Sequence, residues 1–467
     1  MLSRWFLVAS LFVSVSLPSA ANAQLCADTA PLAFDSSLAG ESLSVASDPT
    51  SSRVVSLQAN TAYELDATSL GILDDTSLSD DGIAIRFDRV SPEETAFITQ
   101  TDGYVEAYAQ ENATSWLVSW TRRLSRAGCP LDTLARGPAA HHPRAIATPS
   151  FVGTFGDDLL YVGTSFVQHS SQSYPACTGT YNADNRVYAL EASSGDIAWV
   201  FNLMEGSDVD QIAGMALDPQ ADRLYVASER TYASDQPSLR ALDVLSGTEV
   251  WSADAGRIQV APVLHGGRLY IATVAGEIKA LDPATGSEYW SFPGGVPFTA
   301  GAELTLWDLA NGDTLIASVD LFGQLRVVRD DGPSGDAVAW FRLPDGAAGM
   351  VGAPSVQATS RIVTDESGTG LVSADDGKVY PVDLVTGTVG TPVAVDAVTE
   401  SVPHLVLEPP GAFASPASFL VATSGGVIAR YCTTVGAPPA VPALGPWALG
   451  ALASALLAVG ASQFTRR

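Results

Sequence analysis

The sequence predicts an all-β fold, a β-propeller of about eight four-stranded blades, because one short block recurs at a regular spacing. The block A-L-D-x-x-[ST]-G-x-E-x-W occurs twice between Pro237 and Phe292, and its two tryptophans are 39 residues apart. Two more strand-like segments lie between the copies, separated by Gly266 and Gly267, so one period holds about four short antiparallel strands. A four-stranded unit of about 40 to 50 residues is typical of a propeller blade.

Each copy of the block predicts a β-hairpin. In the first copy a strand ends at Asp243, the chain turns at Gly247, and the next strand reaches Trp251. The second copy repeats the turn at Gly286 and the tryptophan at Trp290. Glycine suits such a turn because it adopts positive φ without a Cβ clash.

Weaker copies continue the spacing in both directions. Trp199 ends an upstream copy, Thr391 stands where a downstream copy would have its tryptophan, and a further copy reaches Trp340 five residues after Gly335 instead of four. Strand-like segments start near residues 53, 103, 185, 237, 276, 323, 377 and 425. They predict eight blades, with seven as the alternative.

The recurring tryptophans predict a structural role. One indole per repeat, at Trp199, Trp251, Trp290 and Trp340, would bury a large apolar area between neighbouring sheets. A cofactor would need a single platform, whereas these indoles recur in every good copy. We therefore interpret them, like the turn glycines, as repeat structure, and we predict no catalytic, cofactor-binding or metal-binding residue.

The blocks ALDVLSGTEVW and ALDPATGSEYW resemble the repeat of the quinoprotein-like β-propellers. That family includes the pyrroloquinoline quinone (PQQ) dehydrogenases and the propeller lipoprotein of outer-membrane barrel assembly. The resemblance runs from about Asn185 to Val395 and implies the fold far more than any function. PQQ dehydrogenases typically carry an adjacent cysteine pair against the cofactor, and this sequence has no Cys-Cys. We therefore expect no cofactor, and PQQ binding in particular is not expected.

Residues 1–23 read as an export signal peptide. Arg4 gives a charged start, an apolar run extends from Trp5 to Leu17, and Ala21-Asn22-Ala23 is a small-x-small cleavage site. Gln24 and Leu25 do not form a lipobox before Cys26, so we expect no N-terminal lipid anchor. The propeller domain is then 24–433, with an insertion at about 121–184.

The full chain is strongly acidic. It has 51 Asp plus Glu against 24 Lys plus Arg and a formal net charge of -27, which argues against nucleic acid as a partner. Solubility is the plainest interpretation of this charge. Calcium is an alternative, with candidate ligands in Asp74, Asp75, Asp80 and Asp81 and in Asn182, Asp184 and Asn185, but neither group has the spacing of a calcium loop and both also read as turns.

Four cysteines in an exported chain predict disulfides. A propeller brings its two ends into one blade, so we expect Cys26 to pair with Cys432. Cys129 and Cys177 bracket the long insertion and would pair with each other. Four unconnected thiols are the alternative.

The C-terminus predicts a membrane segment. Residues 434–443 form a proline-rich spacer, and 444–467 contain an uncharged apolar run followed by arginines, long enough for one transmembrane helix. The order resembles the IPTL-type C-terminal sorting signal of Gram-negative bacteria, although Ala448 replaces its usual glycine. This resemblance implies recognition by a sorting enzyme, with a plain tail anchor as the alternative. The matching residues are Val441, Pro442, Leu444, Trp447, Arg466 and Arg467.

These features predict an exported, non-catalytic propeller in the cell envelope of a Gram-negative bacterium. It would be anchored by its C-terminal helix or released to the surface after sorting, and would bind a protein or other envelope partner. Two alternatives stay open: a PQQ-dependent or otherwise cryptic oxidoreductase, and a structural adhesin or matrix component. No G-x-S-x-G, P-loop or H-E-x-x-H motif supports a familiar enzyme class.

Overall fold

The computed structural model confirms the all-β fold class, since the residues that it describes contain strands and turns and no helix. Those residues are 22–25, 32–33, 44–48, 53–58, 61–66, 72–78, 82–88, 95–100, 104–112, 115–124, 142–147, 159–165, 186–203, 210–230, 237–258, 260–294, 304–309, 311–320, 324–332, 335–342, 362–364, 369–373, 378–386, 389–394, 403–407, 418–423 and 427–434.

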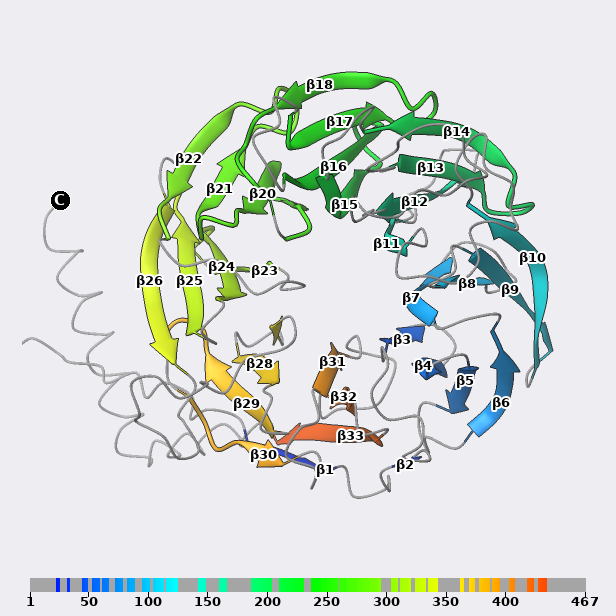
Figure 1. Cartoon of the computed structure of the whole chain (residues 1–467). Helices are drawn as coiled ribbons and strands as arrows, with labels where there is room; N and C mark the ends of the chain where they lie inside the picture. The colour runs from blue at the N-terminus through cyan, green and yellow to red at the C-terminus, as the bar shows by residue number, and fades with distance from the viewer. Residues whose placement is uncertain are drawn as a thin grey trace, which may run out of the picture.

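The described strands form consecutive antiparallel sheets arranged around a ring (Figure 1), which we number in chain order. In sheets 1 to 7 four successive strands pair as neighbours, the first innermost and the fourth at the rim. Sheets 1 to 4 comprise β3 (Ser44–Asp48), β4 (Arg53–Gln58), β5 (Thr61–Asp66) and β6 (Ile72–Ser77); β7 (Gly82–Asp88), β8 (Thr95–Gln100), β9 (Tyr104–Asn112) and β10 (Ser115–Arg123); β11 (His142–Ala147), β12 (Leu159–Ser165), β13 (Arg186–Glu191) and β14 (Ile197–Asn202); and β15 (Asp210–Asp218), β16 (Arg223–Arg230), β17 (Leu239–Asp243) and β18 (Glu249–Ala253).

The remaining sheets continue the same order. Sheets 5 to 8 comprise β19 (Val263–His265), β20 (Arg268–Ala272), β21 (Ile278–Leu281) and β22 (Glu288–Phe292); β23 (Thr305–Asp308), β24 (Thr314–Val319), β25 (Gln324–Asp330) and β26 (Gly335–Arg342); β27 (Val363–Thr364), β28 (Thr369–Ser373), β29 (Lys378–Asp383) and β30 (Val393–Ala394); and β31 (Pro403–Leu407), β32 (Ser418–Thr423) and β33 (Val427–Thr434) with β1 (Asn22–Leu25) and β2 (Leu32–Ala33).

The two ends of the described chain meet in sheet 8. β1 pairs antiparallel with β33, from Asn22 opposite Thr434 to Leu25 opposite Tyr431, and β2 also pairs with β33. The N-terminal strand therefore closes the ring against the last strand, as expected for a propeller. The predicted signal cleavage site after Ala23 lies within β1.

All but one of the predicted strand starts coincide with the third strand of a sheet. Those near residues 103, 185, 237, 276, 323, 377 and 425 match the third strands of sheets 2 to 8, whereas the start near 53 matches β4, the second strand of sheet 1. Two strands of sheet 3, β11 and β12, come from the range 121–184 that the sequence suggested as an insertion. These two strands therefore belong to the repeat, and most of the rest of the range lies outside the described residues.

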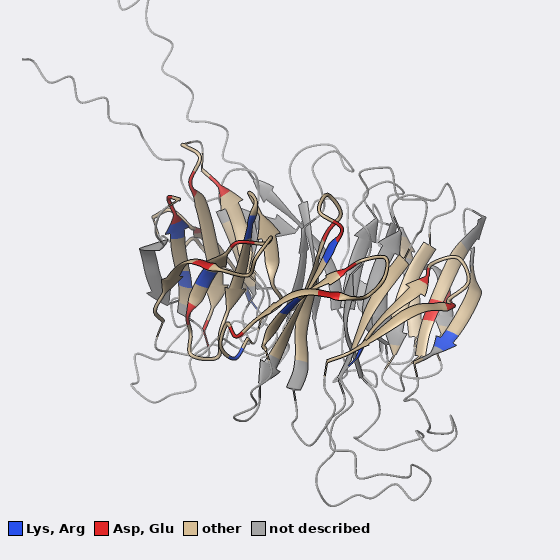
Figure 2. Cartoon of the chain, turned by 90° about the horizontal axis from the view of Figure 1, so that it is seen from above, with Lys and Arg blue, Asp and Glu red and all other residues tan. Residues whose placement is uncertain are grey.

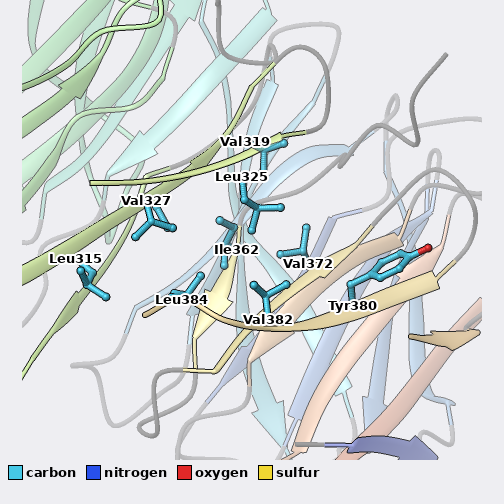
Figure 3. Packing of buried hydrophobic residues seen from close by; sticks show 10 residues of the cluster. Leu315, Val319, Leu325, Val327, Ile362, Val372, Tyr380, Val382 and Leu384 are labelled. Atoms are coloured by element: carbon cyan, nitrogen blue, oxygen red, sulfur yellow. The ribbon is translucent and has the colours of Figure 1, made fainter. Parts of the chain in front are cut away.

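The hydrophobic core lies between neighbouring sheets rather than in a single centre. Figure 3 shows this for sheets 6 and 7, where Leu315 and Leu325 approach Ile362, Val382 and Leu384. Every residue of β24 is buried, as expected for a strand covered on both faces. Each sheet is therefore stabilised mainly by its neighbours in the ring, and contacts across each seam matter most for stability.

The predicted C-terminal helix and its sorting motif lie outside the described residues. Within the described residues, no helix is long and apolar enough to span a membrane.

Candidate functional site

The seam between sheets 3 and 4 shows what the recurring tryptophan does. Trp199 of β14 donates its indole N–H to the carbonyl of Val244, in the turn between β17 and β18, over 2.9 Å. The Tyr161 hydroxyl donates to the same carbonyl over 3.2 Å. Gly247 in that turn has φ 68°, and a Cβ built on it would lie 2.6 Å from the Trp199 ring. The indole thus lies against a turn that only glycine can form at this distance.

The same contact joins two further pairs of sheets. Trp251 donates to the Pro283 carbonyl over 3.0 Å and lies against Gly286, which has φ 73°. Trp120 of β10 donates to the Ala192 carbonyl over 2.7 Å. Sequence reasoning kept the strand around Trp120 but missed its place in the set. The strand register shows that Trp120 belongs to the set, because it lies opposite Ala107 beside a bulge just as Trp251 lies opposite Ala241.

The repeated aspartate belongs to the turn. One Asp243 carboxylate oxygen accepts backbone N–H bonds from Leu245 and Ser246, over 3.2 and 2.9 Å, and Asp383 does the same for Val385 and Thr386. The backbone N–H of Ser246 holds the pKa of Asp243 below its usual value. This residue therefore stabilises the hairpin.

The pattern breaks at the seam between sheets 5 and 6. Trp290 of β22 is buried, with 7% of its surface exposed, but its indole N–H finds no acceptor among the described residues. The facing hairpin is two residues longer: after the bulge Val328 pairs with Ala337, nine residues on, whereas Leu242 pairs with Glu249, seven residues on. The seam at which the indole has no acceptor among the described residues is therefore also the seam with the longer turn.

Ion pairs bridge this seam instead. Arg268 of β20 contacts the buried carboxylate of Asp330 at 3.0 Å, and the Tyr270 hydroxyl donates to the same carboxylate over 2.7 Å. His265, which faces Arg268 across the Gly266-Gly267 turn, lies 2.7 Å from a carboxylate oxygen of Asp308. The contact with His265 lowers the pKa of Asp308, and burial raises the pKa of Tyr270. We call His265, Arg268, Asp308 and Asp330 the charged seam.

A fully buried ion pair within sheet 6 also contacts sheet 5. Arg326 of β25 donates to one Asp320 oxygen from two nitrogens, over 3.2 and 3.1 Å, and to the Gly276 carbonyl of sheet 5 over 3.1 Å. Both side chains are almost entirely buried, so each charge depends on the other.

Trp340 does not occupy the recurring position. It pairs with Arg326, while Ala339 holds the place that Trp199, Trp251 and Trp290 hold in their sheets. The extra residue between Gly335 and Trp340 accounts for this shift.

Some predicted site residues lie partly or wholly outside the described residues. Cys432 lies in β33 and pairs with Gln24, whereas Cys26, Cys129 and Cys177 are not described, and neither are the sorting residues from Val441 to Arg467. Among the candidate calcium ligands, Asp74 and Asp75 are consecutive residues of β6, and the others lie outside the described residues.

Three recurring indoles, those of Trp120, Trp199 and Trp251, each donate a hydrogen bond to a neighbouring turn. Within the described ranges, no group of three or more His, Cys, Asp or Glu residues could hold a metal ion.

Four-stranded antiparallel sheets in a ring, with one indole against the next turn, define a PQQ-repeat β-propeller. The model of one such family, described as outer membrane protein assembly factor BamB, matches residues 101–390, more than half of the chain. The chain belongs to this family. No curated protein sequence matches it.

Solved structures of unlike function share the fold. BamB from Moraxella catarrhalis matches with a TM-score of 0.54 at 16% identity, covering 88% of this chain and 98% of that one. Sqt1 from Saccharomyces cerevisiae has a TM-score of 0.54 at 12% identity, with 86% and 97% covered. The quinohemoprotein alcohol dehydrogenase ADHIIG from Pseudomonas putida HK5 has a TM-score of 0.53 at 12% identity, covering 89% of this chain and 76% of that one. At these identities the likeness shows the fold alone.

Proposed function

We propose that the chain is an exported, eight-bladed propeller that binds a protein partner in the envelope of a Gram-negative bacterium and performs no chemistry itself. Membership of the BamB-described family over residues 101–390 carries this proposal. The recurring indoles and carboxylates support it, because their contacts are structural.

The C-terminal tail supplies the anchor in this proposal. The apolar run of 444–467 holds the propeller at the membrane, and the Val441 to Arg467 motif presents it to a sorting enzyme that releases it to the surface. Deleting 444–467 should move the folded protein into the soluble fraction. Membrane retention of the truncated protein would contradict this anchor.

The experiment for partner binding is in vivo photocrosslinking of the full chain. A photoreactive residue in place of Leu245 or Val385, which are exposed in turns, should give discrete crosslinked protein bands. The same residue in place of buried Val226 is the control and should give none. Smears or no adducts from every exposed site would contradict partner binding.

The oxidoreductase alternative is tested separately. A ligand that binds the folded state raises the melting temperature by mass action. Because we expect no PQQ binding, adding PQQ with calcium should leave the melting temperature unchanged. Saturable stabilisation with dye-reducing activity would replace the proposed function by the enzymatic one.

A further inference from the structure

Among the described residues, nothing pairs with the outer edge of β14 at the rim of the ring. It is the last strand of sheet 3 and pairs only with β13 within that sheet (Figure 1). After a bulge at Ala198, residues Trp199–Asn202 run in continuous register with Ala189–Arg186. One side of this backbone therefore presents hydrogen-bonding groups that no strand of the sheet covers.

β14 also lacks the charged residues that the outermost strands of other sheets carry. Its sequence is Ile-Ala-Trp-Val-Phe-Asn, which has no charged residue, proline or glycine and is rich in β-branched and aromatic side chains. Every other fourth strand of five or more residues carries a charge. Those charges are Asp74 and Asp75 in β6, Arg122 and Arg123 in β10, Glu249 in β18, Glu288 in β22, and Asp336 and Arg342 in β26.

Apart from Asn202 at its end, the exposed side chains of β14 are apolar. Trp199 and Phe201 turn inward and pack on the cluster between sheets 3 and 4, whereas Ile197 and Val200 remain 44% and 41% exposed. Arg122 of β10 covers the turn before β14 by bonding the Gly195 carbonyl and the Asp196 carboxylate. The uncovered edge is therefore the stretch beyond Trp199.

The net negative charge of the chain indicates which kind of segment could bind beside β14. A second copy would bring another net charge of -27 to this edge, and an acidic segment would meet the same repulsion. Acidic side chains are distributed around the described part of the ring (Figure 2), so a basic segment is attracted and an uncharged one is not repelled.

We propose that β14 receives an extended, uncharged or basic segment of a partner protein, which adds to sheet 3 as a fifth strand. Backbone hydrogen bonds would supply affinity, and contacts with Val200 would favour alternating apolar residues. This inference rests on the proposed function and assigns it a surface and a partner chemistry.

The test uses the full chain in detergent and a seven-residue capped peptide that alternates valine with threonine and lysine. Hydrogen exchange should slow about fivefold or more at 199–202 when the peptide is saturating, and stay unchanged in β18. Val200→Lys should weaken binding about tenfold, because it places a charge where the strand must pack. Val250→Lys is the matched control: it adds the same charge to β18 at a site 44% exposed, and should leave binding unchanged. A peptide with glutamate for lysine should bind more weakly.

Three outcomes would overturn the inference: no slowing at 199–202 in the wild-type protein, equal slowing on β18, or equal weakening by Val250→Lys. The wild-type measurement stands whether or not a variant folds. Protection of β14 without peptide, rising with protein concentration, would identify a second copy as the occupant and overturn the partner assignment. Discrete photocrosslinks at other surfaces together with an inert β14 would reject this edge and leave the proposed function standing.

Discussion

Trp251 and Gly286 belong to neighbouring sheets and contact each other so closely that a Cβ built on Gly286 would lie 2.7 Å from the indole ring. The same indole donates a hydrogen bond to the carbonyl of Pro283, three residues before that glycine. Because each sheet buries its apolar faces against the next, this contact fixes both the spacing and the rotation of two blades.

Replacing Gly286 by alanine should therefore destabilise the ring strongly. Alanine would clash with Trp251 and would also have to adopt φ 73°, and together these cost about 2 to 4 kcal/mol in the free energy of unfolding. Urea denaturation followed by tryptophan fluorescence measures the change.

Gly266→Ala is the matched control for that experiment. Gly266 also has positive φ, at 57°, but nothing lies within 4 Å of its built Cβ. The Gly266→Ala variant should lose only about 1 kcal/mol in the free energy of unfolding, because alanine there has to adopt positive φ but meets no neighbouring atom. Equal losses at the two glycines would show that the indole contact contributes nothing.

Trp251→Phe and Trp290→Phe should differ, although the two tryptophans hold equivalent places in their sheets. Phenylalanine at 251 loses the bond to Pro283, whereas at 290 it removes a buried N–H that has no acceptor among the described residues. Leaving such a donor buried costs about 1 to 3 kcal/mol, which offsets the lost ring area. Calorimetry should show Trp251→Phe as the more destabilising change by about 1 kcal/mol or more. The reverse order would mean that Trp290 has an acceptor outside the described ranges.

The sequence predicted the hairpins from Asp243 to Trp251 because turn chemistry is local: the glycine, the capping aspartate and the spacing lie within one short block. It placed Trp340 in the set although the extra residue after Gly335 moves that indole one position along its strand. It missed Trp120 because the hairpin between Gln110 and Trp116 lacks the D-x-x-[ST]-G turn of the other copies. The charged seam joins His265 to Asp308 and Arg268 to Asp330. These partners are more than 40 residues apart, and no local pattern reports them.

Breaking the pair of Arg326 and Asp320 should be far more costly than breaking an exposed pair. Arg326→Met would leave the Asp320 carboxylate buried without its counter-ion, at a cost of about 3 to 5 kcal/mol. Asp196→Asn, which breaks the exposed pair with Arg122, should cost about 1 kcal/mol or less. Comparable losses in thermal unfolding would contradict the burial of the first pair. The double variant Arg326→Met, Asp320→Leu should recover part of the loss.

Acid should weaken the hairpin turns through Asp243. Its pKa is lowered in the folded state by the backbone N–H of Ser246, so its contribution is fully present above the unfolded pKa of about 4. That contribution is lost as the pH falls through the lower, folded pKa. Asp243→Asn should therefore reduce stability at pH 7 and flatten its dependence on pH below about 4. Unfolding curves for both proteins measured from pH 7 to 3 test this, and parallel curves would contradict it.

The closure of the ring in sheet 8 bears on the predicted disulfide between Cys26 and Cys432. β1 pairs with β33 so that Gln24 lies opposite Cys432, and Cys26 follows Gln24 by two residues. Residues two apart in an extended strand share a face, and diagonal Cα atoms across antiparallel strands are about 7 to 8 Å apart. A disulfide needs about 7 Å or less between its Cα atoms, so the register of β1 beside β33 is compatible with a bond between Cys432 and Cys26, which itself lies outside the described residues.

We therefore expect Cys26 to be bonded to Cys432, and Cys129 to Cys177. In the chain-entropy model the loop of about 400 residues closed by the first bond stabilises the fold by roughly 5 to 6 kcal/mol, against about 4 for the loop of about 50 residues closed by the second. The first bond would act at the seam, the one place where the ring can open without breaking the chain, so Cys26→Ser should lower the melting temperature more than Cys129→Ser. Peptide mapping without reduction identifies the pairs directly. A peptide linking Cys26 to Cys129 or Cys177 would refute both bonds, and it would conflict with a β1 that lies beside Cys432 in sheet 8.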